Sequence, residues 1–238
     1  DSNSANEPVW CGPLAAFEKW YTEIESSLNV TLGRRLAYAS AESEERRWSH
    51  APPLPKSWFK QRAKRIAEIN KDWALRGLGQ LDLLESTDES QTLIVANRSH
   101  SSISAGIANA AWECISEKRF KFQWSDRGAG ETLIEVSDDP REIPSPSEMT
   151  VKWSNIEVSL QDSESFFDRA RHESDGVWTV EGNRGIILYL DHILRFENLS
   201  IPYLAECVRK SDYSTEWIGI EDKEKLVLWD AMADASRL

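Results

Sequence analysis

The stretch "RGLGQLDLLES", residues 76–86, decides how this chain is interpreted, because it joins a predicted helix to a predicted strand. The helical pattern before it runs to about Trp73, and Leu81 and Leu83 alternate with polar residues as in a half-buried strand. Gly77 and Gly79 lie between the two elements. They form either the glycine loop of a nucleotide site or a sharp corner at the edge of a sheet.

The order of the elements argues against a nucleotide site at these glycines. A dinucleotide-binding loop follows a strand and precedes a helix, because the helix N-terminus holds the pyrophosphate. Here the order is helix, glycines, strand, and the third glycine of that motif is missing. We therefore predict that Gly77 and Gly79 permit a helix-to-strand corner or a close approach of the backbone.

The elements on both sides of the corner predict the fold class. Upstream, apolar residues at helical spacing predict helices at 13–27, at 29–48 and from Pro55 to about Trp73. Downstream, we predict a strand after Gly79, a strand at 92–98, a helix rich in small residues at 102–118, and strands at 119–126 and 132–137. The expected fold is α+β, with N-terminal helices packed on an antiparallel sheet built of two hairpins around a central helix, plus a smaller C-terminal α/β extension.

A proline-rich stretch divides the sequence into two predicted parts. Residues 138–148 carry three prolines and no apolar period, so we expect a first domain at 1–138, a linker at 139–149 and a C-terminal α+β subdomain at 150–238. The expected C-terminal elements are a strand at 150–160, a short helix from Phe166 to His172, a strand and turn at 176–185, an amphipathic helix over Ile186–Leu194, a helix capped by Ser200, a strand at 216–220 and a helix capped by Asp222.

The charge balance limits the partners of the chain. A net charge of −12 repels phosphates, so we expect no nucleic-acid partner. The Glu and Arg residues of 29–48 and the basic cluster at 60–65 are interpreted as solvated helix faces. No apolar run approaches the ~18–20 residues of a membrane span, so we expect no membrane partner.

The cysteines indicate a reducing compartment. Cys11, Cys114 and Cys207 are odd in number and far apart, which is typical of reduced thiols in a cytoplasmic protein. Neither the spacing of zinc ligands nor that of a carboxylate metal loop is present, so we expect no metal and no cofactor.

Tryptophan is unusually frequent, with eleven residues scattered without a period. Large aromatic side chains fill cores and anchor subunit contacts, which is the interpretation we favour. The alternative, a platform that stacks on a sugar or a base, requires several of them to cluster on one surface.

The motif "EGNRG", residues 181–185, is the best candidate for an anion site. It precedes the predicted helix over Ile186–Leu194, so Gly182, Asn183, Arg184 and Gly185 would sit near the positive end of that helix. The alternative is a plain turn in which Gly182 and Asn183 take positive φ.

Asp191 and His192 are weak acid and base candidates on the same predicted helix. Adjacent residues on a helix do not face each other, so they form no dyad as written. His192 could instead act with Glu181 or Asp212, but nothing in the sequence fixes that geometry, and surface residues without a catalytic role are the favoured interpretation.

Part of the chain resembles a known family. The "LGRRLA" segment at Leu32–Ala37, the "GLGQLDLL" strand, the "TLIVANRS" strand and the small-residue helix resemble the 4-vinyl-reductase-like ligand-binding domain, and equally the D-type component of cellulose synthase, over about residues 28–137. The resemblance is carried by Gly77, Gly79, Leu81, Leu83 and Asn97. Vinyl-reductase-like domains often carry metal- or ligand-binding cysteines in the last hairpin, where this chain has Phe122, Trp124 and Ile134.

The resemblance implies an α+β domain that dimerises or forms larger rings and binds ligands or partners. We therefore expect a non-enzymatic accessory protein that works as a homo-oligomer and binds a protein partner or a small-molecule ligand. The alternative is a hydrolase or transferase that acts on an anionic small molecule in a cleft between the two halves, around Arg184, Asp191 and His192. A third interpretation, a phage- or toxin-related interaction protein, is neither supported nor removed by the sequence.

Overall fold

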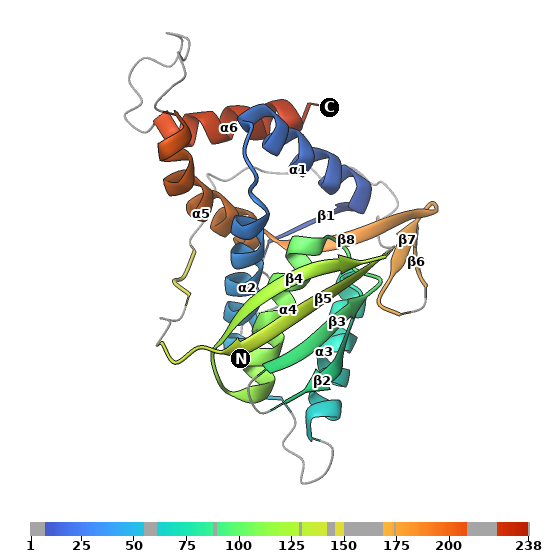
Figure 1. The fold of residues 1–238 in the computed structure, drawn as a ribbon. Helices are drawn as coiled ribbons and strands as arrows, with labels where there is room; N and C mark the ends of the chain where they lie inside the picture. The colour runs from blue at the N-terminus through green and yellow to red at the C-terminus, as the bar shows by residue number, and fades with distance from the viewer. Residues whose placement is uncertain are drawn as a thin grey trace.

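The computed structural model describes residues 8–54, 61–87, 90–128, 130–141, 146–149, 169–173, 175–208 and 223–237. These residues form helices and two antiparallel four-stranded sheets, which confirms the predicted α+β class (Figure 1). Some predictions, among them the strands at 150–160 and 216–220 and the cap at Asp222, fall outside the described residues.

The larger sheet consists of the two predicted hairpins. Its strand order is β2 (Gln80–Ser86), β3 (Ser90–Ala96), β5 (Glu131–Asp138) and β4 (Phe120–Arg127). The chain passes from the first hairpin to the second through α4 (Ser101–Ser116). The side chains facing that helix are buried, as the alternating pattern of the strands predicts, and include Leu81, Leu93, Val95, Ile134 and Val136.

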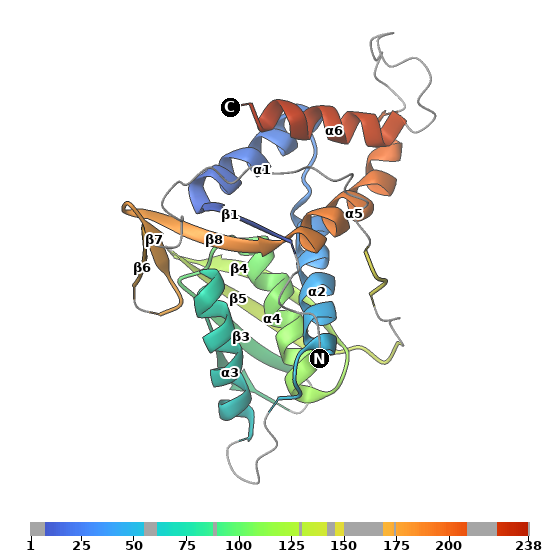
Figure 2. The same ribbon diagram turned by 180° about the vertical axis from the view of Figure 1, so that it is seen from behind.

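Three helices cover one face of this sheet. Figure 2 shows α2 (Gly33–His50), α3 (Gln61–Arg76) and α4 in front of the strands. The axes of α2 and α4 approach closely at Gly106, where an added Cβ atom would collide with the carbonyl oxygen of Ala37. Nearly every side chain of α4 is buried, so the small-residue helix is the central packed element that its sequence predicted.

The smaller sheet joins the two ends of the chain. Strand β1 (Val9–Pro13) pairs with β8 (Asn183–Tyr189), followed in order by β7 (Trp178–Val180) and β6 (Ala170–His172). Above this sheet, α1 (Leu14–Leu28) packs on α6 (Lys223–Ala235) (Figure 1). The predicted division at 139–149 stays a prediction, but described residues from both sides of it share one sheet.

Two predictions for the C-terminal part are wrong. The predicted helix over Ile186–Leu194 is strand β8 up to Tyr189, and α5 begins only at Leu190. The run "GIILYL" satisfies a helical period as well as a strand period, and pairing with β1 makes it a strand. The helix predicted to start at Ser200 is part of α5, which runs from Leu190 to Val208 with Pro202 inside it.

The described end of a third predicted helix is also a strand. Ala170–His172 forms β6, which pairs with β7 through Ala170 and Val180. The residues from Phe166 to Asp168 lie outside the described residues.

The glycine corner is confirmed and also joins the two sheets. Gly77 and Gly79 have φ of 72° and 93°, a region that strongly favours glycine. A Cβ atom on Gly77 would collide with the carbonyl oxygen of Gly185 in β8. The Gly79 amide donates to the Gly176 carbonyl at 3.2 Å, just before β7. The corner therefore turns the chain from α3 into β2 and holds the smaller sheet against it.

Candidate functional site

The predicted anion motif is a hairpin turn between β7 and β8. Positive φ values occur at Glu181 (52°) and Gly182 (80°), so the turn alternative is correct for Gly182 but wrong for Asn183. Asn183, Arg184 and Gly185 enter strand β8, and the helix N-terminus that motivated an anion site is absent at this position. Anion binding at this motif stays a prediction without that support.

Arg184 instead fastens the glycine corner. Its Nη2 donates to the carbonyl oxygen of Gly77 at 3.3 Å and to that of Asn97. Burial lowers the pKa of this guanidinium. The side chain thus stabilises the junction between the two sheets, which is a structural role.

His192 lies in the interface between α2 and α5. Its Nε2 is 2.9 Å from Oγ of Ser40, whose hydroxyl donates to the carbonyl oxygen of Leu36 at 2.7 Å. While the Ser40 hydroxyl donates to Leu36, the tautomer of His192 that is protonated at Nε2 can donate to Ser40. Burial lowers the pKa of His192 to about 4, and its side chain is 3% exposed, so it is a neutral packing residue without access to a substrate.

Asp191 has different partners from its neighbour. Its Oδ2 accepts from Nε of the buried Arg195 at 2.9 Å, and Arg195 also contacts Glu42 at 3.2 Å. Glu181, one predicted partner of His192, pairs with Arg169 at 2.7 Å, and Asp212 lies outside the described residues. The described members of the predicted acid–base set are not brought together.

A buried ion network, which the sequence interpretation missed, joins α2 to α3. Glu44 accepts from Nη2 of Arg76 at 2.7 and 2.9 Å and from Nε1 of Trp73 at 3.1 Å, and Asp72 pairs with Arg76 at 2.6 Å. Burial alone would raise the pKa of Glu44, but Arg76 and Arg47 lower it to about 2. The Glu and Arg residues of α2 are therefore not all solvated, which corrects the expectation for 29–48.

One cavity with aromatic walls lies between the two ends of the chain. This apolar cavity has a volume of about 470 Å³, and its lining includes Trp10, Phe17, Trp20, Leu190, Ile193 and Ala235. These residues come from β1, α1, α5 and α6. The ring of Phe17 has its centroid 6.1 Å from Trp10 and 5.8 Å from Trp20, and Nε1 of Trp20 donates to the Met232 carbonyl at 3.3 Å. Two of the scattered tryptophans thus meet at one site.

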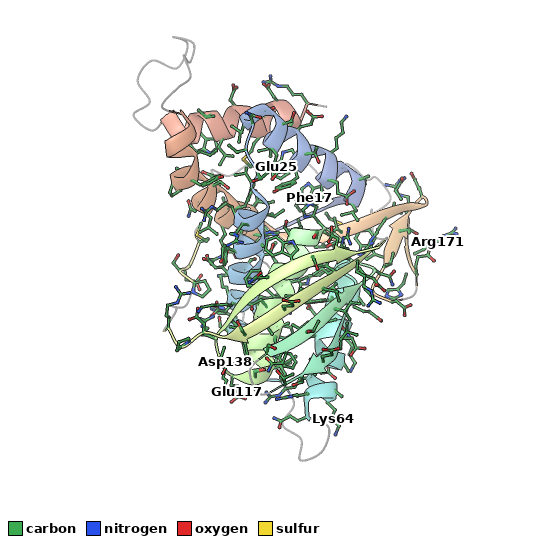
Figure 3. All side chains as sticks on the ribbon, viewed as in Figure 1. Phe17, Glu25, Lys64, Glu117, Asp138 and Arg171 are labelled. Carbon is green, nitrogen blue, oxygen red and sulfur yellow. The ribbon has the colours of Figure 1, made fainter. Side chains whose placement is uncertain are left out.

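A second cavity lies where α3 begins and α4 ends. This polar cavity has a volume of about 520 Å³, and its lining includes Gln61, Arg62, Arg65, Ser86, Gln91, Trp112, Ser116, Glu117, Lys118 and Asp138. Side chains with hydrogen-bonding or charged groups dominate its walls. The two cavities lie in different parts of the molecule, as the labels of Phe17, Glu117 and Asp138 indicate in Figure 3.

Metal-binding clusters and membrane-spanning helices do not occur in the described part of the chain. Among these residues, no group of three His, Cys, Asp or Glu side chains is arranged to hold a metal ion. No described helix has the length and apolar character needed to cross a membrane.

Comparison of the sequence with profiles of known protein families and with curated proteins found no match. The resemblance to vinyl-reductase-like domains and to the D-type component of cellulose synthase therefore stays a prediction. The two cavities are the candidate sites, and neither has a direct signal in the sequence, because the walls of each come from several separate elements.

Proposed function

We propose that this chain is a non-enzymatic binding protein that holds an apolar small molecule in the apolar cavity. The main support for the proposal is that Trp10, Phe17 and Trp20 together line a cavity of about 470 Å³. Small-molecule sites are typically concave, largely apolar and about 300–1,000 Å³ in volume. The cavity has this size and this chemistry.

The aromatic walls favour a ligand that contains a ring or a flat apolar group. Aromatic pairs attract each other in offset and edge-to-face arrangements, and the rings of Trp10 and Trp20 are tilted against Phe17 by 52° and 43°. A flat ligand placed among these rings would contact their faces and edges together. Lys19 and Ser236 also line the cavity and would lie near a polar end of such a ligand.

Binding is favoured over catalysis because the predicted acid–base residues are buried or already paired with other groups. His192 is buried against Ser40, Asp191 is paired with Arg195, and Arg184 binds two backbone carbonyls. None of the three is among the residues that line the apolar or the polar cavity. A hydrolase or transferase site around them is therefore the less favoured alternative.

We further propose that the chain works as a homo-oligomer or with a protein partner, in the cytoplasm. The resemblance over residues 28–137 supports the assembly, and the free thiols of Cys11 and Cys114 support a reducing compartment. Light scattering of the purified chain tests the assembly, and a monomer at all concentrations would contradict that part of the proposal.

Binding is tested with Nile red, a neutral aromatic dye that fluoresces in apolar surroundings. We expect saturable binding at one site per chain. Ala16 lines the cavity and its side chain is exposed, so Ala16→Phe should fill the space without removing an existing contact and should abolish the saturable signal.

The matched control is Ala15→Phe, on the same helix but outside the cavity lining. This variant should bind Nile red as the unmodified chain does. Equal binding by both variants, or no saturable binding by the unmodified chain, would show that the proposal is wrong.

A further inference from the structure

The polar cavity has a surplus of positive charge in a strongly acidic chain. Arg62, Arg65 and Lys118 line it together with two acids, Glu117 and Asp138, which leaves a net charge of +1. The chain as a whole carries −12. A local reversal of sign inside a concave site concentrates ligands of the opposite charge, because low-dielectric walls focus the field.

Both acids of the cavity already have cationic partners. Glu117 pairs with Arg65 at 3.1 Å, and Asp138 lies 3.5 Å from Nζ of Lys118. Arg65 is 5% exposed, and its Nη1 also donates to the Ile115 carbonyl at the end of α4. Neither acid is therefore available to neutralise a third cation.

Arg62 is the cation that supplies the surplus. Its one partner in the described part of the chain is the ring of Trp112, whose centroid lies 5.5 Å from the guanidinium carbon. Trp112 is 1% exposed, and its Nε1 donates to Oε1 of Gln91 at 3.3 Å, so the ring is a fixed support. A guanidinium held against an aromatic ring keeps its N–H groups for an acceptor in the plane of the group.

Unsatisfied polar atoms occur in the same wall. Nε of Arg65 and Oγ of Ser116 are buried without a hydrogen-bond partner. Both atoms belong to side chains that line the cavity but are themselves enclosed, so a bound molecule would be held by the exposed groups of Arg62 and Lys118 instead. Gln61 and Ser86 add an amide and a hydroxyl as neutral donors.

We propose that the polar cavity binds a small oxyanion, a carboxylate or a phosphate, with Arg62 as its main charged contact. The planar fork of an arginine matches two oxygens of either group. Lys118 and the donors of Gln61 and Ser86 would surround the remaining oxygens. This site is independent of the apolar cavity and shares no lining residue with it.

The test is isothermal titration of the full chain with inorganic phosphate and, separately, with citrate, in a low-salt buffer without other oxyanions. We expect saturable binding of at least one of them, weakened by added sodium chloride. Arg62→Gln should weaken that binding about tenfold or more, because it removes a charge-assisted hydrogen-bonding group. The anion that binds identifies the phosphate or the carboxylate class.

Lys71→Gln is the matched control, since it removes one positive charge from the same helix at a side chain outside the cavity. It should leave the affinity unchanged. The proposal is overturned if neither anion binds at 10 mM (about 100 times a 0.1 mM dissociation constant), or if both variants bind alike.

Nile red binding by Arg62→Gln separates this proposal from the function proposed above. Retained dye binding with lost anion binding supports a separate oxyanion site. Loss of both, in a variant whose thermal unfolding is unchanged, would overturn the independence of the two sites.

Discussion

The two cavities are similar in volume but are built in opposite ways. The apolar cavity, about 470 Å³, is walled by elements from both ends of the chain, whereas the polar cavity, about 520 Å³, is walled by residues within 61–138. Packing of aromatic and aliphatic side chains holds the first, and ion pairs and side-chain hydrogen bonds hold the second. The apolar cavity therefore forms only when segments far apart in the sequence have packed together. The polar cavity depends on contacts among residues of one continuous part of the chain.

The largest expected effect comes from breaking the buried network that joins α2 to α3, outside both cavities. Glu44→Ala leaves the buried Arg76 with Asp72 as its one acidic partner among the described residues, and we expect a loss of about 3–5 kcal/mol in the free energy of unfolding. Urea unfolding of the variant and of the unmodified chain measures this loss of free energy. Arg76 also lies against the Tyr189 ring at the end of β8, next to Leu190 of the apolar cavity, so this change should also disturb that cavity.

Glu45→Ala is the control for that change. Glu45 pairs with Arg119 at a partly exposed site, so its loss should cost less than about 1 kcal/mol. Similar losses for Glu44→Ala and Glu45→Ala would contradict the role assigned to the buried network.

Acid should weaken the region around α5 through His192. Its pKa is lowered from 6.5 to about 4, chiefly by burial and against the opposing effect of Asp191, so the unfolded chain takes up the proton first. Stability is then fully present above pH 6.5 and falls as the pH drops from 6.5 to about 4. The loss from this residue is about 3 kcal/mol.

Urea unfolding between pH 7 and pH 4 measures this effect, with His192→Gln as the comparison. Glutamine keeps a donor for Ser40 and has no titrating group. His100, whose pKa burial also lowers to about 4, adds a loss in the same direction in both proteins. An identical pH dependence in the two would refute the assignment.

The smallest expected effects on stability come from single substitutions in the walls of the two cavities, and their difference tests how each wall is built. Ile193→Ala in the apolar cavity should destabilise the chain by about 1–2 kcal/mol, since it removes packing from a half-buried site. Arg62→Gln in the polar cavity should change stability by less than about 0.5 kcal/mol, because Arg62 is exposed. Thermal unfolding of both variants checks the difference, and the reverse order would invalidate the comparison of the cavities.

The larger sheet could be predicted because its signals are local. Alternating residues in 80–96 and 120–138, the small-residue helix between them, and Gly77 and Gly79 each indicate one structure. The smaller sheet could not, because β1 has only five residues and its partner β8, Asn183–Tyr189, lies far from it in the sequence. The run at 186–189 fits two periods, and only that distant pairing selects the strand.

The candidate sites were harder to predict than the fold. Glu44 and Arg65 stand among other charged residues, and nothing in their sequence neighbourhood signals that their side chains are 2% and 5% exposed. The sequence indicates His192 as an acid–base candidate because histidine titrates near neutral pH, but the side chain is buried in the interior. Nothing in the sequence distinguishes Arg62 from the other basic residues around it. Burial and pairing, which decide such roles, come from the tertiary structure.

The pairing of Val9 with Tyr189 also has a consequence for synthesis of the chain. On the ribosome, β1 emerges before β8 and lacks this partner until β8 has been made. The larger sheet and its helices come from one continuous segment and can fold while synthesis continues. The edge of β1 that pairs with β8 stays uncovered during that interval and is open to chaperones that bind nascent chains.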